Sequence, residues 1–501
     1  MTATVRPRLP AAAILFAVAV ALVGGVAGAQ AIDTDEESLF GSPDEDDHGT
    51  QESLDAADPF GSPDREDESV GDSSIDTSDL FDSDLFEGEV PATEPGTAGA
   101  AAAPPPPPVE IGGAYRFSLT GEAHWASPAE LADEPLQPDS HRATVDLGAT
   151  VFLDARPADD FRVFGKVDLS YPFSTDADAQ PAREFDDVVK VKELFSDFSV
   201  GDALFLRGGK HTIAWGVGYF FSPADVLNLT AIDPEDPDAE REGPVSLRAN
   251  LPIDFHNLYL YAIADPIEGG VQLAAAPKAE VVLDGAEVGI GAYFHPERVP
   301  RAMLTLTTSL LDFDLFAELE GSLGSDRRFV QRAARGTGNA FGLRTARNTE
   351  DPFAAATAGL RYTYAPAEED WSATLAGQYL WNGEGYADPA VLRDNRAGVA
   401  ALLAAGDLSG ADLAFRGRHY AAASLNVALG RGADWSAGVL WLSNLSDGSA
   451  RIAPSVTFRP LDHLSLRAAA TVTYGEEGAE MTPLGPRVGA SLTATLGSGR
   501  F

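Results

Sequence analysis

Apolar and polar residues alternate with a period of two from residue 109 to the C-terminus. In residues 141–157, for example, Val145 and Leu147 fall on one face and Asp146 falls on the other. Such alternation predicts β-strands with one face in apolar surroundings. The runs last 9–13 residues, a length typical of tilted strands that cross a membrane.

This pattern predicts strands in 18 segments. They are 112–125, 141–155, 160–171, 188–200, 203–215, 243–251, 254–263, 277–284, 286–295, 300–310, 312–322, 354–364, 370–381, 416–429, 434–444, 449–459, 462–474 and 486–496. The connections mostly alternate between short and long, and the long ones include 172–187, 216–242, 323–353 and 382–415. Barrels of bacterial outer membranes have short periplasmic turns and long outer loops. We therefore expect an all-β fold: a transmembrane antiparallel β-barrel of 16–18 strands preceded by a disordered acidic arm.

Aromatic residues lie near the ends of the predicted strands, where the interfacial girdles of membrane barrels are found. They are Trp125, Tyr171, Tyr259, Tyr261, Tyr293, Phe294, Tyr362, Tyr364, Tyr379, Trp381, Trp435, Trp441 and Tyr474. The chain ends in Phe501, and a terminal aromatic residue after an alternating strand resembles the signal read by the barrel assembly machinery. These features predict outer-membrane lipids, that machinery and periplasmic chaperones as partners.

The N-terminus has the pattern of an export signal. Residues 1–31 contain Arg6 and Arg8, then the apolar run AAAILFAVAVALVGGV and the small-residue segment AGAQA. This is the order found in secretory signal peptides. The chain has no cysteine, which excludes a lipoprotein anchor, disulfides and thiolate chemistry. No second apolar run is long enough for a membrane helix.

Residues 32–108 form a second segment of distinct composition. Residues 33–90 carry 22 Asp and Glu against one Arg, a net charge of 1 − 22 = −21, which is half of the −42 of the whole chain. Such a segment cannot bury enough apolar surface to fold, so we expect a disordered periplasmic arm. This arm allows three roles: its single phenylalanines could be docking motifs, its carboxylates could attract Ca²⁺ weakly, or it could be a solvated tether. Five prolines at 104–108 form a stiff spacer before the barrel at 109–501.

In this layout residues 109–501 resemble an outer-membrane porin-type β-barrel. The motif GGKHTIAWG, followed by PADVLN, is similar to a segment of outer-membrane barrel families of this size. The resemblance implies a channel for small hydrophilic solutes, without cofactor or metal. It also implies that the third outer loop folds into the barrel, as in the general porins.

If the apolar face meets lipid, the polar face lines the lumen, and its first strands are rich in basic residues. The predicted pore-lining residues are Arg116, Arg142, Arg162, Lys166, Lys190, Lys192, Arg207, Lys210 and Arg248, against the acids Glu122, Asp146, Asp154 and Asp168. Such a wall attracts anions and repels cations. Alternatively, the arginines pair with acidic loops and only hold the lumen together.

The stretch RGGKHTIAWGVGYFFSPADVLN at 207–228 has an apolar phase that shifts after its first glycines. Leu204 and Leu206 precede the shift, and Ile213 and Trp215 follow it. A β-bulge at Gly208 and Gly209 explains such a shift and turns Lys210 inward. The loop beyond carries the predicted constriction acids Asp225, Asp233, Glu235, Asp236, Asp238 and Glu240. Opposite a basic wall, they would create a transverse field. A short helix is expected at PADVLNL, after Ser222.

Two other long loops have their own signals. Residues 323–353 are rich in arginine, so this loop could meet an anionic surface glycolipid or fold inward. Residues 382–415 predict a short helix with Asp388 as N-cap, Pro389 in the first turn and Gly406 at the end.

Three functional classes compete. Eight histidines are scattered singly, and the sequence contains neither G-x-S-x-G nor H-E-x-x-H, so no catalytic residues are predicted. The strong negative charge, without a basic aromatic tract, does not support nucleic-acid binding. A structural or adhesin-type barrel, with its arm docked to periplasmic partners, is the alternative to a porin-like channel for solutes that include anions. The layout also allows a homo-oligomer.

Overall fold

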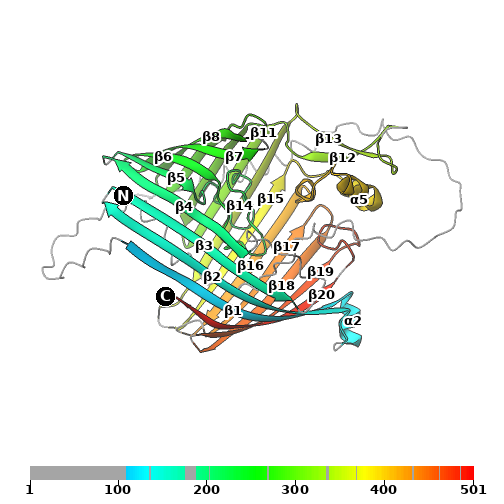
Figure 1. The fold of residues 1–501 in the computed structure, drawn as a ribbon. Coiled ribbons are helices and arrows are strands. Elements are labelled where there is room, and N and C mark those ends of the chain that lie inside the picture. Colours follow the sequence, from blue (N-terminus) through cyan, green and yellow to red (C-terminus); the bar gives the residue numbers. More distant parts are fainter. Residues whose placement is uncertain are drawn as a thin grey trace, which may run out of the picture.

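The chain forms a closed antiparallel β-barrel of 18 strands in a computed structural model (Figure 1). The structure describes residues 109–500, except 135–136, 159, 175–187, 202, 268–269, 335–337, 368, 431–433, 462 and 486. The predicted signal peptide (1–31), acidic arm (32–108) and terminal Phe501 lie outside the described residues.

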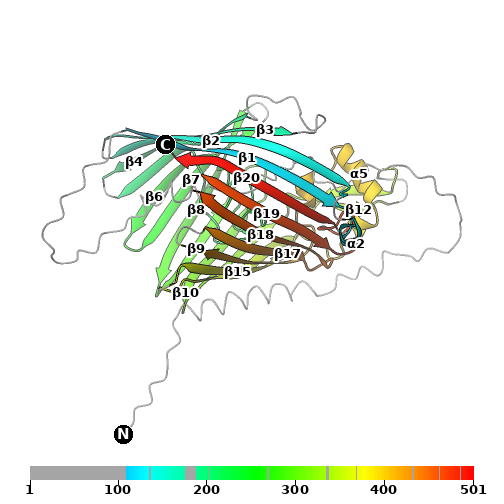
Figure 2. The same ribbon diagram turned by 90° about the horizontal axis from the view of Figure 1, so that it is seen from below.

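Each barrel strand pairs with the next along the chain. The strands are β1 (Val109–Trp125), β2 (Ser140–Ala158), β3 (Phe161–Ser174), β4 (Val189–Val200), β5 (Leu204–Lys210), β6 (Val245–Ile253), β7 (His256–Ile267), β8 (Gly270–Leu283), β9 (Ala286–Tyr293), β10 (Arg301–Leu310), β11 (Phe313–Leu323), β14 (Pro352–Tyr364), β15 (Trp371–Asn382), β16 (His419–Leu429), β17 (Trp435–Asn444), β18 (Ser449–Leu461), β19 (Leu464–Tyr474) and β20 (Val488–Arg500). Strand β20 pairs with β1, which closes the barrel (Figure 2). The predicted 16–18 strands are confirmed at the upper value.

Short connections lie at one end of the barrel, which we call the turn end, and the longest ones lie at the other, the loop end. At the turn end, Asp284 and Gly285 join β8 to β9 with positive φ angles of 48° and 83°. This conformation suits an Asp-Gly hairpin turn. Strand β1 begins and β20 ends at the turn end.

The loop end carries the helices and a separate hairpin (Figure 1). The elements there are α2 (Pro128–Asp133), the hairpin β12 (Arg328–Arg332) and β13 (Leu343–Arg347), α4 (Ala390–Arg393), α5 (Arg396–Ala404) and α6 (Gly410–Leu413). None of the helices in the described part of the chain is long and apolar enough to cross a membrane.

Large apolar side chains cover much of the outward face. Residues directly opposite each other in an antiparallel pair point to the same side of the sheet. Leu119, Leu194 and Leu492 are 47%, 57% and 62% exposed on the outward side. The strand neighbours of Leu119 and Leu492 are polar and point into the barrel, as with Thr120 and Thr493, whose hydroxyls lie 3.0 Å apart.

The predicted aromatic girdle is present only in part. At the turn end the tilted rings of Tyr364 and Trp371 have centroids 5.3 Å apart, and the Trp435 and Phe458 ring centroids are 4.2 Å apart. The prediction was wrong for three tyrosines of the first half of the barrel, Tyr259, Tyr261 and Tyr293. Tyr259 packs beside Tyr261 on β7, with ring centroids 6.1 Å apart.

Tyr261 and Tyr293 are 3% and 6% exposed and belong to an apolar cluster inside the barrel. Their positions near strand ends satisfied the girdle pattern, but register places them on the inward face, opposite Arg248 and Arg301.

Candidate functional site

The inward face of β1–β3 is a ladder of ion pairs between neighbouring strands. The Arg116 guanidinium lies 3.3 Å from Asp146, and Arg142 lies 2.9 Å from Glu122. Further along, Arg162 lies 2.9 Å from Asp154. All these side chains were predicted to line the lumen, and the structure brings each base together with an acid. The wall therefore carries both signs of charge.

A β-bulge lies in β4 at Lys192. The register of β3 with β4 runs from Lys166 opposite Glu193 to Val167 opposite Val191, which leaves Lys192 unpaired. Its ammonium lies 3.6 Å from Asp168. Because a bulge exchanges the two faces of a strand, the residues after Lys192 alternate in the opposite phase.

This bulge brings two acids to the inner wall that the sequence reading had missed, Glu193 and Asp197. Asp197 accepts two hydrogen bonds from Arg207, at 2.7 Å from Nε and 3.0 Å from Nη2. Arg207 is 5% exposed and its guanidinium also lies over the Phe195 ring, 4.1 Å from the centroid. A bidentate, buried pair of this kind is held in one geometry.

The predicted bulge at Gly208 and Gly209 was wrong. Strand β5 keeps a continuous register through both glycines, with β4 on one side and β6 on the other. Gly209 has a φ of +135°, and a Cβ there would lie 2.2 Å from the Leu194 carbonyl oxygen, so only glycine fits. The apolar phase changes because the chain leaves the sheet after Lys210.

Lys210 was predicted to face the lumen, and this was also wrong. It lies opposite Leu194 and Val245, whose side chains are exposed on the outer surface. Without a bulge, Lys210 stays on that side at the end of β5, where its ammonium pairs with Glu242.

The last predicted bases also line the inner wall. Lys190 lies opposite Asp168 in register. Arg248 on β6 lies directly opposite Arg207 on β5 and opposite Tyr261 on β7. The Nε atom of Arg248 is buried without a hydrogen-bond partner in the described structure. Among the nine predicted bases, Arg248 and Lys190 form no ion pair with a described carboxylate.

Residues 211–244, which we call the inner loop, cross the inside of the barrel. On β8, Lys278 donates to the Trp215 carbonyl at 3.2 Å. On β3, Lys166 pairs with Glu240 at 2.7 Å, and on β18 Arg451 pairs with Glu235. Contacts to strands so far apart in the barrel order require the loop to lie inside it.

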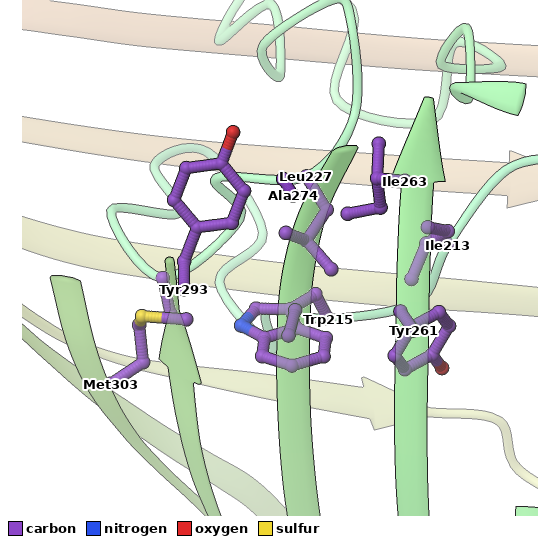
Figure 3. Packing of buried hydrophobic residues seen from close by; sticks show 10 residues of the cluster. Ile213, Trp215, Leu227, Tyr261, Ile263, Ala274, Tyr293 and Met303 are labelled. Atoms are coloured by element: carbon purple, nitrogen blue, oxygen red, sulfur yellow. The ribbon is translucent and has the colours of Figure 1, made fainter. Parts of the chain in front are cut away.

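The start of the inner loop is held by an apolar cluster (Figure 3). Ile213 and Trp215 are 2% and 1% exposed. The Trp215 ring packs edge-on against Tyr261, with centroids 5.4 Å apart. Gly291 on β9 makes room for it, because a Cβ there would lie 2.6 Å from the indole. Ile213 and Trp215 are therefore apolar because they pack inside the barrel.

Two polar side chains of the opposite wall fix the middle of the inner loop. The Glu318 carboxylate on β11 accepts the N–H groups of Val217, Gly218 and Ala224, the last two at 2.6 and 2.9 Å. The Gln378 side-chain oxygen on β15 accepts the N–H of Phe220 at 2.6 Å.

Sequence reasoning did not single out either residue. The signal was the inward phase of the segment FDLFAELEGSL, where Glu318 and Glu320 stand two residues apart.

The helix predicted at residues 223–229 does not form. The Ala224 N–H is taken by Glu318, and the Asn228 side chain bridges the Ile213 carbonyl and Asp225, each at 2.8 Å. These bonds replace the ones a helix would make.

The six predicted constriction acids separate into different environments. Asp225 is buried within the loop and pairs with Arg241, and burial raises the pKa of its carboxyl while Arg241 opposes the rise. Asp238 accepts the Tyr219 hydroxyl at 3.0 Å.

Of the other four, Glu235 and Glu240 pair with Arg451 and Lys166 on the wall. The backbones of Asp233 and Asp236 pair with each other in an isolated β-bridge within the loop.

The loops at the loop end pack on each other. Val330 and Leu343 of the β12–β13 hairpin form an apolar cluster with Leu392, Val399 and Leu402 of α4 and α5. The arginine-rich loop thus supports the neighbouring loop; its arginines also cap carbonyl groups, as Arg327 does for Asp412 at 2.8 Å.

The helix predicted at 388–406 is present but broken. Asp388 accepts the Ala390 N–H at 2.9 Å, α4 ends at Arg393, and α5 starts at Arg396 and ends before Gly406, which has a φ of +71°.

Two histidines of the described ranges illustrate how these side chains are placed. His419 bonds the Tyr379 hydroxyl at 2.6 Å, and His295 lies 3.1 Å from Asp265. Within the described ranges, no group of three or more His, Asp or Glu side chains could hold a metal ion.

No known protein family matches the chain, and no curated protein matches it either. Several solved structures are similar at low identity. Acinetobacter baumannii OccAB1 is 11% identical, with 78% of this chain and 97% of that chain covered and a TM-score of 0.44. Pseudomonas aeruginosa OpdQ is 8% identical, with 78% and 99% covered and a TM-score of 0.44. Pseudomonas putida OprB is 10% identical, with 78% and 94% covered and a TM-score of 0.40.

Proposed function

We propose that this chain is an outer-membrane channel through which small hydrophilic solutes diffuse passively. The observation that carries the proposal is the closed 18-stranded barrel with an apolar outer face and a charged inner face. Because the barrel is closed, the backbone N–H and C=O groups at every strand edge find hydrogen-bond partners, which a sheet that spans lipid requires. Leucines such as Leu119 and Leu194 on the outer face are stable there and costly in water.

The inner loop gives the channel its narrow zone. Polar and charged contacts hold it against strands on several sides, from Lys166 on β3 to Glu318 on β11. A polar loop fixed across a wet lumen restricts passage by size and charge. No chemistry is required of the protein.

The charge of the wall is close to balanced, which favours a mild anion preference over a strong one. The inner wall of β1–β6 has nine bases, with Lys210 excluded and Arg156 added, and seven acids once Glu110, Glu193 and Asp197 are added: 9 − 7 = +2. Glu240 on the inner loop offsets one more charge at Lys166.

The start of the first strand supports a periplasmic location for the turn end of the barrel. Strand β1 starts there, so an exported chain would present residues 32–108 to the periplasm. Signal cleavage, the assembly machinery and periplasmic chaperones belong to the same proposal, as does a homo-oligomer.

Single-channel recording of the folded full-length barrel in planar bilayers tests the function. We expect a steady conductance and a reversal potential in a salt gradient that indicates weak anion preference. A folded barrel that stays silent would support a structural or adhesin-type role instead. Strong cation preference would contradict the basic wall.

A further inference from the structure

A cavity of about 470 Å³ lies beside the inner loop, toward the loop end of the barrel. It is bounded by the inner loop, strands β10, β11 and β15, and the loop 383–418. Cavities that hold small molecules have volumes of roughly 300–1,000 Å³. None of the predicted pore-lining bases borders it, so it is separate from the basic wall.

One wall of the cavity is aromatic. Phe220 and Phe221 of the inner loop are 1% and 3% exposed, and Phe415 meets Phe221 edge-on with centroids 5.9 Å apart. Leu380 of β15 completes this wall. The Gln378 and Glu318 bonds hold the inner-loop backbone around these rings in place.

The facing wall is charged, with an excess of acids. Arg301 lies 3.3 Å from Glu320 and 3.4 Å from Asp326. The lining also includes Glu384, whose carboxylate accepts the Ser325 hydroxyl at 2.6 Å. Arg327 and Asp412 also line the cavity, so two guanidiniums and four carboxylates give a net charge of 2 − 4 = −2.

Most of these charged groups are already engaged. Arg327 donates to backbone carbonyls of loop 383–418. Asp412 accepts the Ser409 and Arg328 N–H groups at 2.8 Å each.

Glu320 differs from them. The residue is 5% exposed, and its Oε1 meets Arg301, while its Oε2 has no hydrogen bond or ion pair to any described residue. A buried side chain whose free carboxylate oxygen borders a cavity can accept a donor from a ligand in that cavity.

We infer that this cavity binds a small organic cation that carries a primary ammonium on an apolar group of aromatic size. The inference rests on the proposed channel function, since the ligand would be a solute that enters from the loop end. An ammonium has three donors for the free oxygens of Glu320 and its acidic neighbours. The apolar part would pack on the phenylalanine wall, where a cation is also favoured near ring faces.

The test uses benzylammonium as the probe and benzyl alcohol as its neutral counterpart. Calorimetric titration of the detergent-solubilised full-length protein measures affinity, and current block in bilayers measures entry from the loop end. We expect benzylammonium to bind about tenfold or more tightly than benzyl alcohol, the worth of one charge-assisted contact. Glu320→Gln should remove most of that preference.

Glu122→Gln is the matched control, because it removes one inward carboxylate from the far wall without touching the cavity. Its benzylammonium affinity should equal that of the unmodified chain. If Glu320→Gln fails to fold, Glu384→Gln in the loop tests the same acidic wall.

Equal affinities for the two probes, or equal losses in Glu122→Gln and Glu320→Gln, would overturn the inference while leaving a conducting channel intact. A silent folded barrel that still prefers benzylammonium would instead overturn the channel and support the site.

Discussion

The carboxylate of Glu318 on β11 accepts the backbone N–H of Gly218 at 2.6 Å, which ties the inner loop to the wall opposite its origin on β5. The same carboxylate serves Val217, Ala224 and the Ser222 hydroxyl. One buried side chain thus organises the turn that narrows the barrel.

Replacing Glu318 with alanine should release this part of the inner loop. Three backbone donors lose their acceptor, at a cost of roughly 2–4 kcal/mol. We expect larger and noisier single-channel currents and faster proteolysis next to Phe220. Glu122→Ala removes an inward glutamate that pairs with Arg142 on the neighbouring strand, so its currents should keep their normal noise. A quiet, unchanged current in Glu318→Ala would show that Gln378 and the apolar cluster hold the loop alone.

Gly218 should tolerate no side chain. A Cβ there would lie 1.9 Å from the Phe221 carbonyl oxygen, so Gly218→Ala forces the turn apart and should lower stability by about 1–3 kcal/mol. The shift is measured as the temperature at which the folded band is lost on a gel. Gly121 on β1 is the control, because a Cβ there meets nothing within 4 Å. Equal losses in both alanine variants would contradict the close approach.

The strands were predictable from sequence because one face of each strand meets an apolar environment and the other a polar one, which imposes a period of two on the residues. The same rule failed at Ile213 and Trp215. It treats every apolar residue as facing lipid, whereas these two leave the sheet and pack inside the barrel. The change of phase was real, but a chain that leaves the sheet and a bulge in it look alike in sequence.

The bulge at Lys192 is hidden in the sequence for a related reason. Lys190, Lys192 and Glu193 are all polar, so the alternation does not reveal which of them is unpaired. Only the register with β3 settles it, and with it the inward position of Asp197. The contacts of Glu318 join residues about a hundred positions apart, beyond the reach of any local pattern.

The packing of the loop 475–487 should weaken as pH rises. Burial raises the pKa of the Glu480 carboxyl, and Arg416 and the Tyr420 hydroxyl, 2.7 Å away, only partly oppose this. A folded-state pKa above the unfolded value means that the stabilisation is complete below the ordinary carboxyl pKa. It is then lost as pH rises through the raised value, by at most about 1.4 kcal/mol per pH unit.

Hydrogen exchange of this loop over an acid-to-neutral series, corrected for intrinsic rates, measures the effect. Glu480→Gln should flatten the profile. Glu476→Gln, at an exposed acid of the same loop, should leave it unchanged. Protection that increases with pH would reverse the assigned direction.

Arg248 should contribute more to anion preference than the bases of the wall that form ion pairs. It stands opposite Arg207, whose charge is neutralised by the bidentate pair with Asp197, and none of the described carboxylates forms an ion pair with Arg248 itself. A unit charge about 4 Å from a passing ion is worth about 1 kcal/mol in water, or up to roughly fivefold in local concentration. Arg248→Gln should therefore shift the reversal potential in a salt gradient toward cations.

Lys210→Gln is the matched control for this change, because it removes the same charge from the outward side of β5. Its reversal potential should stay close to that of the unmodified chain. Equal shifts in the two variants would mean that total charge, and not the inner wall at Arg248, sets the selectivity.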